Sequence, residues 1–179
     1  QRIRLRRAHE PLLVRVPCEL EGLARQAPRL SAVVRLAHCV ADAAVCARGA
    51  SVLVSCLRQQ NIGHILEDSS GNGGAAIAAY GAAAGMAVKV LVPASTSPAK
   101  IAQVRAYGAD IDLIPGPREA TEAAAIEQAS EIFYASHNWH PFFLQGTKML
   151  GYEIWEDLGF AVPDNIIIPA SAGSNLLGC

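Results

Sequence analysis

The sequence predicts an α/β protein in which a parallel sheet lies between flanking helices, in a three-layer arrangement. From residue 49 onward, short apolar runs alternate with segments of helical pattern. Runs such as Ile166–Ile168 are apolar throughout, which is typical of strands buried on both faces. The helical patterns end at glycines, namely Gly85, Gly108 and Gly159. In such sheets ligands bind beyond the carboxyl ends of the strands, so we look for function in the loops that follow strands.

The predicted helices and strands follow one another with short connections. Ser97 and Pro98 mark one helix start, as N-cap and first helical residue. Helices are predicted at Ala50–Gln60, Gly74–Ala84, Pro98–Tyr107, Arg118–Ser130 and Phe142–Leu158. Strands are predicted at Ile62–Glu67, Ala87–Val92, Ile111–Ile114, Ile132–Tyr134 and Ile166–Pro169. A last helix opens after the small-residue loop that follows Pro169.

The N-terminal part has a different composition. Residues 1–48 contain nine arginines and no lysine, and prolines interrupt their weak periodicity. We expect one or two helical turns at Leu20–Ala27 and a helix at Leu30–Ala47. Because the composition changes abruptly, an altered or frame-shifted coding segment before Arg48 is a hypothesis.

Composition narrows the function classes. The 179 residues have a net charge of −1, which gives no electrostatic reason to expect nucleic acid or an anionic membrane as partner. No apolar stretch approaches the roughly 20 residues of a membrane span. The five cysteines are odd in number and form no CxxC, so free thiols in a cytoplasmic protein are expected. His137 and His140 stand three residues apart, but two histidines do not complete a zinc site, and we expect no metal.

Two loops can bind an anion. The first is Ser69-Ser70-Gly71-Asn72-Gly73-Gly74, which follows a strand and begins a helix. A helix start offers unpaired N–H groups and a positive dipole end, and Asn72 adds a side-chain amide donor. The second loop, Ala170-Ser171-Ala172-Gly173-Ser174, also joins a strand to a helix. Its small residues and hydroxyls suit a phosphate group. For both loops, a tight turn without a ligand remains an alternative interpretation.

The first loop and its surroundings resemble the fold-type-II pyridoxal-phosphate (PLP) enzymes. Glu67 to Ala76 looks like their asparagine loop, and the threonine-synthase branch fits better than the dehydratases or cysteine synthases. The motifs that carry the resemblance continue through Tyr80–Gly85, Lys89–Pro93, Ser97–Gln103, Tyr107–Ala109, His137–Phe142, Gly146–Lys148, Tyr152–Trp155 and Pro163–Pro169. The resemblance covers roughly residues 48–179. It implies an unmatched segment at 1–47, a small asparagine-loop domain at 48–160, and the truncated start of a large domain at 161–179.

The resemblance also implies roles for individual residues. Asn72 would hydrogen-bond the ring hydroxyl oxygen of the cofactor, pyridoxal 5′-phosphate. The substrate carboxylate would be bound by Ser69, Ser70, Gly71 and Gly73. The cofactor phosphate would be held by Ser171, Ala172, Gly173 and Ser174, a loop that is richer in glycine in the family.

The lysine that such enzymes require is missing. PLP chemistry needs an amine for its Schiff base. By the resemblance, Cys46 occupies the lysine position, just before the matching Arg48-Gly49. The chain has only three lysines, Lys89, Lys100 and Lys148, and all three fit ordinary family positions away from the cofactor. We therefore identify no catalytic residue.

The resemblance implies elimination or replacement on an amino-acid substrate such as a phosphohomoserine, impaired here by the missing lysine. One alternative is a non-catalytic remnant or a module that binds anions or amino acids. Another is an activity like that of a serine/threonine dehydratase or a cysteine synthase. The expected partners are a small amino-acid substrate and either a second copy or a complementing chain, because a truncated large domain leaves apolar surface exposed.

Overall fold

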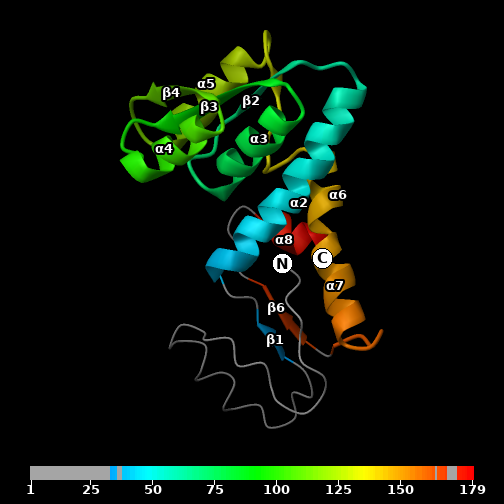
Figure 1. The fold of residues 1–179 in the computed structure, drawn as a ribbon. Helices are drawn as coiled ribbons and strands as arrows, with labels where there is room; N and C mark the ends of the chain where they lie inside the picture. The colour runs from blue at the N-terminus through cyan, green and yellow to red at the C-terminus, as the bar shows by residue number, and fades with distance from the viewer. Residues whose placement is uncertain (1–32, 36–37, 164, 169–172) are drawn as a thin grey trace.

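The computed structural model describes residues 33–35, 38–163, 165–168 and 173–179 (Figure 1). The strands are β1 (Val33–Arg35), β2 (His64–Glu67), β3 (Ala87–Pro93), β4 (Asp110–Ile114), β5 (Phe133–Tyr134) and β6 (Asn165–Ile167). The helices are α2 (His38–Gln59), α3 (Asn72–Ala83), α4 (Pro98–Ala106), α5 (Arg118–Gln128), α6 (Pro141–Thr147), α7 (Met149–Asp157) and α8 (Ser174–Gly178). Most of the predicted elements are therefore present, with small shifts at their ends.

The strands form two parallel sheets. The larger sheet has four strands in the order β4-β3-β2-β5, and all of its pairings are parallel. The smaller sheet pairs β1 with β6, with Val33 opposite Asn165. Because β2 and β5 are parallel neighbours, the loops that follow them leave the same edge of the sheet.

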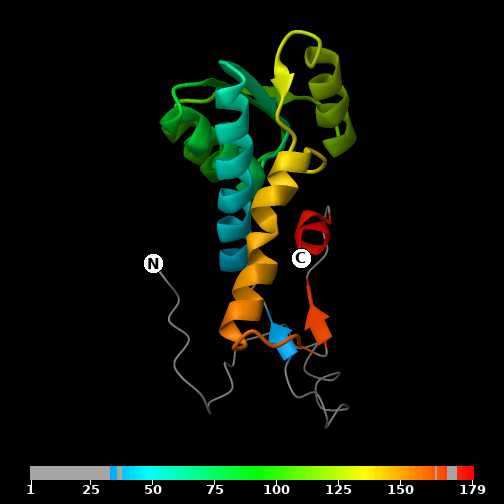
Figure 2. The ribbon, with the colours of Figure 1, turned by 90° about the vertical axis from the view of Figure 1, so that its right-hand side faces the viewer.

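The four-stranded sheet has an apolar layer on each face, as predicted. Along β2, Ile65 faces a large core cluster that also holds side chains of α2 and α3. The next residue, Leu66, faces the other side, where it packs with Ala125 of α5. This alternation follows from the two-residue period of a strand. The result is the expected three-layer α/β architecture, with α5 on the face opposite α2 and α3 (Figure 2).

The predicted helix at Leu30–Ala47 is wrong at its beginning. Residues Val33–Arg35 are strand β1, and helix α2 begins only at His38. The two valines favour a strand, and the parallel partner β6 supplies the hydrogen bonds that stabilise one. The expected turns at Leu20–Ala27 lie outside the described residues.

Helix α2 also continues where two helices were expected. It passes through Gly49 without a break, so the residues of the expected Ala50–Gln60 helix are its second half. A Cβ atom at residue 49 would lie 2.6 Å from the ring of Phe143, so glycine allows α2 and α6 to cross closely. A glycine inside this helix therefore serves packing rather than termination. The helix is continuous across the expected boundary between residues 47 and 48.

The expected long helix at Phe142–Leu158 is instead two helices separated at Lys148. The Thr147 hydroxyl donates to the carbonyl oxygen of Leu144 at 3.1 Å and also lies 3.2 Å from that of Ser174. Such back-bonding by threonine bends helices. In Figure 2, α6 and α7 still follow one another along nearly one line.

Helix ends mostly follow the sequence signals. Gly85 and Gly108 follow helices α3 and α4 with φ values of +71° and +80°, which favour glycine. Ser97 is the N-cap residue of α4 and Pro98 its first residue, as predicted. However, the Ser97 side chain makes no capping hydrogen bond. No helix in the described part of the chain is both long enough and apolar enough to cross a membrane.

Candidate functional site

The loop after β2 ends in an open helix start. Gly71 is the N-cap of α3, and the first intrahelical bond runs from the Ala75 N–H to its carbonyl oxygen at 3.2 Å. The N–H groups of the first helical turn therefore lack intrahelical acceptors and carry the positive end of the helix dipole. Asn72 is exposed at this end, whereas Gly73 beside it is buried. The structure thus presents an amide side chain at a helix start that can receive an anion.

The loop is shaped from within by Ser69 and Gly74. The Ser69 hydroxyl accepts a hydrogen bond from the Gly71 N–H at 3.2 Å. A Cβ atom at residue 74 would collide with the backbone carbonyl of Ser69, so only glycine fits there. Ser69 is buried, whereas Ser70 and Gly71 are half-buried. Of the two serines, Ser70 is the more accessible to a ligand.

Beneath the loop lies a buried ion pair that joins two strands. Glu67, at the end of β2, is fully buried. Its carboxylate oxygens lie 2.6 Å from the His137 ring Nδ1 and 3.1 Å from the His137 backbone N–H, which donates to it. Burial lowers the pKa of His137, but the charge and hydrogen bond of Glu67 and the charge of Asp68 outweigh burial and the opposing charge of Arg118. The net effect raises the pKa of His137 above its ordinary value of 6.5.

Asp68, the next residue, is paired with α5. Its carboxylate is fully buried and lies 2.5 Å from Nη2 of Arg118. The pair is misaligned, since among the described residues neither Asp68 oxygen has a hydrogen bond of good geometry. Burial is the main cause that raises the pKa of Tyr134, and the neighbouring charges of Asp68 and Glu67 add to it. Asp68 thus ties the loop to α5.

The side chain of His140 makes a different contact from that of His137. It is the N-cap of α6, and its ring Nδ1 accepts a hydrogen bond from the Phe142 N–H at 3.3 Å. Partial burial lowers the pKa of His140, which favours the neutral ring that this bond requires. His140 therefore uses its Nδ1 to cap a helix, whereas the Nδ1 of His137 contacts Glu67.

Glu67, Asp68 and His137 do have ligand atoms within 4.8 Å of one another. However, Arg118 already faces Asp68, and His137 already faces Glu67. Each buried carboxylate is matched by one cationic group. A buried cation would add a positive charge beside Arg118, so the cluster is better described as two ion pairs than as a metal centre.

A shallow cavity of about 190 Å³ opens beside Asn72. It is lined by Ala43 and Ala47 of α2, Asn72, Ala75, Ala76, Ala79 and Tyr80 of α3, and Gln103 and Tyr107 near α4. Cys46 does not line this cavity, and its side chain packs against the main core cluster. Ala43 and Ala47 of α2 therefore face the cavity beside Asn72, whereas Cys46 faces the core cluster.

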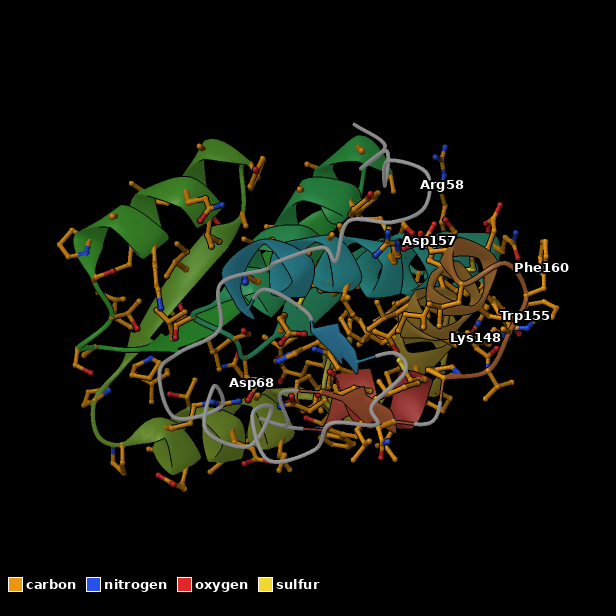
Figure 3. The ribbon with its side chains drawn as sticks, turned by 90° about the horizontal axis from the view of Figure 1, so that it is seen from below. Arg58, Asp68, Lys148, Trp155, Asp157 and Phe160 are labelled. Atoms are coloured by element: carbon orange, nitrogen blue, oxygen red, sulfur yellow. The ribbon has the colours of Figure 1, made fainter. Side chains whose placement is uncertain are left out.

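The three lysines lie elsewhere. Lys89 is paired with Asp112 at 2.7 Å in the sheet, and Lys100 is exposed on α4. Lys148 contacts Gln145 at the junction of α6 and α7. In Figure 3, Lys148 lies toward the end of the molecule that carries Trp155 and Phe160, well apart from Asp68. None of the three lines the cavity beside Asn72.

The predicted phosphate loop is only partly visible. Ser171 and Ala172 lie outside the described residues. Gly173 has a φ of +91° and precedes α8, whose first residue is Ser174. The positions of these two residues match the predicted connection from strand to helix. The assignment of a phosphate to this loop stays a prediction.

The His137–Glu67 pair is the main feature that the sequence did not reveal. Glu67 ends one predicted strand and His137 follows another, so each could be placed at a sheet edge. The order of strands within the sheet is not encoded locally, however, and only the adjacency of β2 and β5 makes the two residues neighbours.

Comparison with known proteins agrees with this architecture. A family model described as "Pyridoxal-phosphate dependent enzyme" matches residues 43–179. Threonine synthase of Methanosarcina acetivorans is 35% identical over 131 residues, which are 72% of this chain and 32% of that protein. Threonine synthase of Methanocaldococcus jannaschii is 33% identical over 110 residues, covering 60% of this chain and 27% of that protein. The chain thus spans about a third of the length of these curated relatives.

Solved structures show the same fold. A maize serine racemase superposes with a TM-score of 0.65 at 26% identity, covering 75% of this chain and 41% of that one. A cysteine synthase of Entamoeba histolytica superposes with a TM-score of 0.67 at 22% identity, covering 75% of this chain and 42% of that one. Because the family model matches most of the chain and includes the asparagine loop, this protein belongs to the pyridoxal-phosphate-dependent enzyme family, in which it is a threonine-synthase-like domain that covers part of the enzyme.

Proposed function

We propose that this chain binds pyridoxal phosphate and an amino-acid substrate without a covalent bond to the cofactor, as the asparagine-loop part of a threonine-synthase-like enzyme. The observation that carries the proposal is the cavity at Asn72. This side chain is exposed at the start of α3 and borders a cavity of about 190 Å³ whose lining includes no lysine. The geometry supports ligand binding and opposes covalent attachment.

The residues of the loop fit the non-covalent part of the task. Asn72 would donate its amide to the ring hydroxyl oxygen of the cofactor. The free N–H groups of the first turn of α3 and the accessible Ser70 would receive the substrate carboxylate. Ser171 to Ser174 would hold the cofactor phosphate. When bound, the cofactor supplies an electron sink for carbanion chemistry, and the protein supplies position and charge.

The covalent part of the task does not fit. Cys46 is half-buried and packs against the core cluster, and it does not line the cavity beside Asn72. We therefore derive no chemical step through the cofactor for this chain alone. Catalysis would require an amine beside Asn72, which none of the three lysines supplies.

The proposed substrate class is a phosphorylated hydroxy-amino acid such as a phosphohomoserine. It is supported by the similarity to threonine synthases at 30–35% identity. A second candidate is a binding module that retains an amino acid or another anion without turnover, because the loop and its ion pairs are complete whereas the lysine is absent. Dehydratase-like or cysteine-synthase-like substrates remain a further proposal, supported by fold similarity to a cysteine synthase and a tomato threonine deaminase.

The visible absorption spectrum of the purified chain with pyridoxal phosphate, before and after borohydride reduction and dialysis, tests the proposal. We expect a cofactor band that binding perturbs, that dialysis removes, and that reduction does not fix to the protein. Asn72→Ala should weaken this binding, and Ser95→Ala, on an exposed turn away from the cavity, is the matched control. A band permanently fixed to Lys89, Lys100 or Lys148 would contradict the absence of a covalent bond. A spectrum identical to that of the free cofactor would contradict binding.

Two lysine substitutions test the geometry of the cavity. Ala47→Lys places an amine on the wall that faces Asn72, whereas Cys46→Lys places one on the core face of α2. We expect reduction to fix the cofactor to the first variant, and the second to be destabilised without attachment. Efficient attachment to the Cys46→Lys variant would show that α2 rotates when the cofactor binds.

A further inference from the structure

The charges around the asparagine loop are balanced in pairs. Among the described residues, the charged groups that face His137 are Glu67 and Asp68 from the end of β2 and Arg118 from α5. Helix α3, which begins above them, has no acidic residue in its first turn. From α6 the neighbour is Phe143, whose ring centroid is 5.9 Å from that of His137. Two buried carboxylates thus face one guanidinium and one imidazole whose pKa is raised.

His137 also touches the loop directly. A Cβ atom at residue 73 would lie only 2.8 Å from Cγ and Cδ2 of the ring, so the ring packs against the Gly73 backbone. Its exposed fraction is 17%, and that of Glu67 is zero. The ring therefore lies between a buried carboxylate and the helix start at which Asn72 is exposed.

Loss of the ring proton would change the charge but not the anchoring bond. A neutral imidazole with its hydrogen on Nδ1 still donates to Glu67 across the 2.6 Å contact. The carboxylate of Glu67, however, would then have no opposing charge. One uncompensated negative charge would lie directly under a helix start that attracts anions, and Coulomb repulsion in a site shielded from water is strong.

We infer that His137 is a positioning and charge-balancing residue of the asparagine loop, whose protonated ring offsets Glu67 so that the start of α3 accepts an anion. The inference deepens the proposed function and rests on it for the identity of the anion. That anion would be the cofactor's ring oxygen or the substrate carboxylate. His137 itself touches no ligand in this arrangement. Anion affinity at the loop should fall as pH rises through the titration of His137.

The probe for this inference is inorganic sulfate, whose charge is constant across the working pH range. Sulfate is added to the 179-residue chain at fixed ionic strength. The backbone amide resonances of Gly71, Asn72 and Gly73 report binding, and the ring resonances of His137 report its protonation. For the wild type we expect the affinity for sulfate to fall about tenfold between about pH 6 and about pH 9. The midpoint of this fall should coincide with the midpoint of the His137 titration.

Three variants separate charge from structure. His137→Gln leaves Glu67 unbalanced, so affinity should be low at every pH. The double variant Glu67→Gln, His137→Gln replaces the ion pair by two amides, so affinity should return and become independent of pH. Glu67→Gln alone should also lose the pH dependence. Without the charge of Glu67, burial favours the neutral ring of His137, and the pair then carries no net charge. The matched control is Glu122→Gln on the exposed face of α5, which should behave as the wild type.

The inference is overturned if sulfate affinity at the loop does not follow the His137 midpoint, if the double variant remains weak while folded, or if sulfate fails to bind there at any pH. Failure of the proposed function looks different. In that case sulfate binding retains its pH dependence, whereas pyridoxal phosphate shows the spectrum of the free cofactor in the presence of the chain.

Discussion

The four-stranded sheet and the segment from β6 to α8 differ in how exposed their apolar side chains are. The four-stranded sheet is covered on both faces, and residues such as Leu53, Ile65 and Phe143 are completely buried around it. In the segment from β6 to α8, Ile166 is 41% exposed, and Leu176 and Leu177 are exposed by 58% and 67%. Two strands are marginal by themselves, whereas three or more with a covered apolar face can be stable.

This difference also separates the two predicted ligand loops. The asparagine loop leaves the covered sheet and is held by Glu67 and Asp68, both fully buried. The connection after β6 leaves the exposed sheet, and only its last residues, Gly173 onward, are described. Buried charged groups hold the asparagine loop in place, so Asn72 is the first position at which to test ligand binding. Four substitutions test this difference between the two regions.

The largest effect is expected at the crossing of α2 and α6. Phe143→Ala removes a fully buried ring that packs against Gly49 and His137, and should cost about 3–5 kcal/mol of the free energy of unfolding. Its neighbour Phe142 is 36% exposed, so Phe142→Ala is the matched control and should cost much less. Urea denaturation followed by circular dichroism measures both. Equal losses would show that the covered sheet does not carry the stability of the chain.

The next effect concerns the ion pair under the loop. Glu67→Gln removes the charge that opposes His137 and should cost about 1–3 kcal/mol near pH 6. The pKa of His137 is raised in the folded state, so its stabilising contribution is complete below its ordinary value of 6.5 and is lost as pH rises through the folded-state pKa. The wild type should therefore lose stability across this window, and the variant should not. Unfolding midpoints measured at several pH values check this, and a parallel decline in both proteins would contradict it.

A smaller effect is expected where α2 meets α7. Nη2 of Arg48 lies 2.7 Å from both carboxylate oxygens of Glu153, but the two side chains are 32% and 42% exposed. Solvent screening limits such a pair to about 1 kcal/mol or less. Glu153→Gln should show this loss at low salt and little of it at high salt. Glu156→Gln, on the exposed side of α7, should show neither change.

The smallest effect on stability is expected in the exposed region. Leu177→Ser should change the free energy of unfolding by no more than about 0.5 kcal/mol, because the side chain is 67% exposed. It should, however, reduce self-association, which exposed apolar patches promote. Light scattering against protein concentration measures this. Leu113→Ser, at an exposed leucine of β4, is the control, and an equal reduction there would mean that association does not arise from the two-stranded region.

The sequence by itself determined the features that depend on near neighbours along the chain. The alternation of strands and helices, the stops at Gly85 and Gly108, and the turn from β2 into α3 at Asn72 all follow from patterns a few residues long. The family resemblance followed from the same local motifs, and it was confirmed over residues 43–179.

The tertiary structure decided what depends on residues far apart in sequence. Val33–Arg35 became a strand because β6 lies beside it, and Gly49 stayed inside a helix because Phe143 packs there. Glu67 and His137, 70 residues apart, became partners only because β2 and β5 are adjacent. Strand order is fixed by the joint burial of several apolar faces and not by any one segment. Candidate ligand residues such as Asn72 could therefore be proposed from sequence, whereas the pairing of Glu67 with His137 could not.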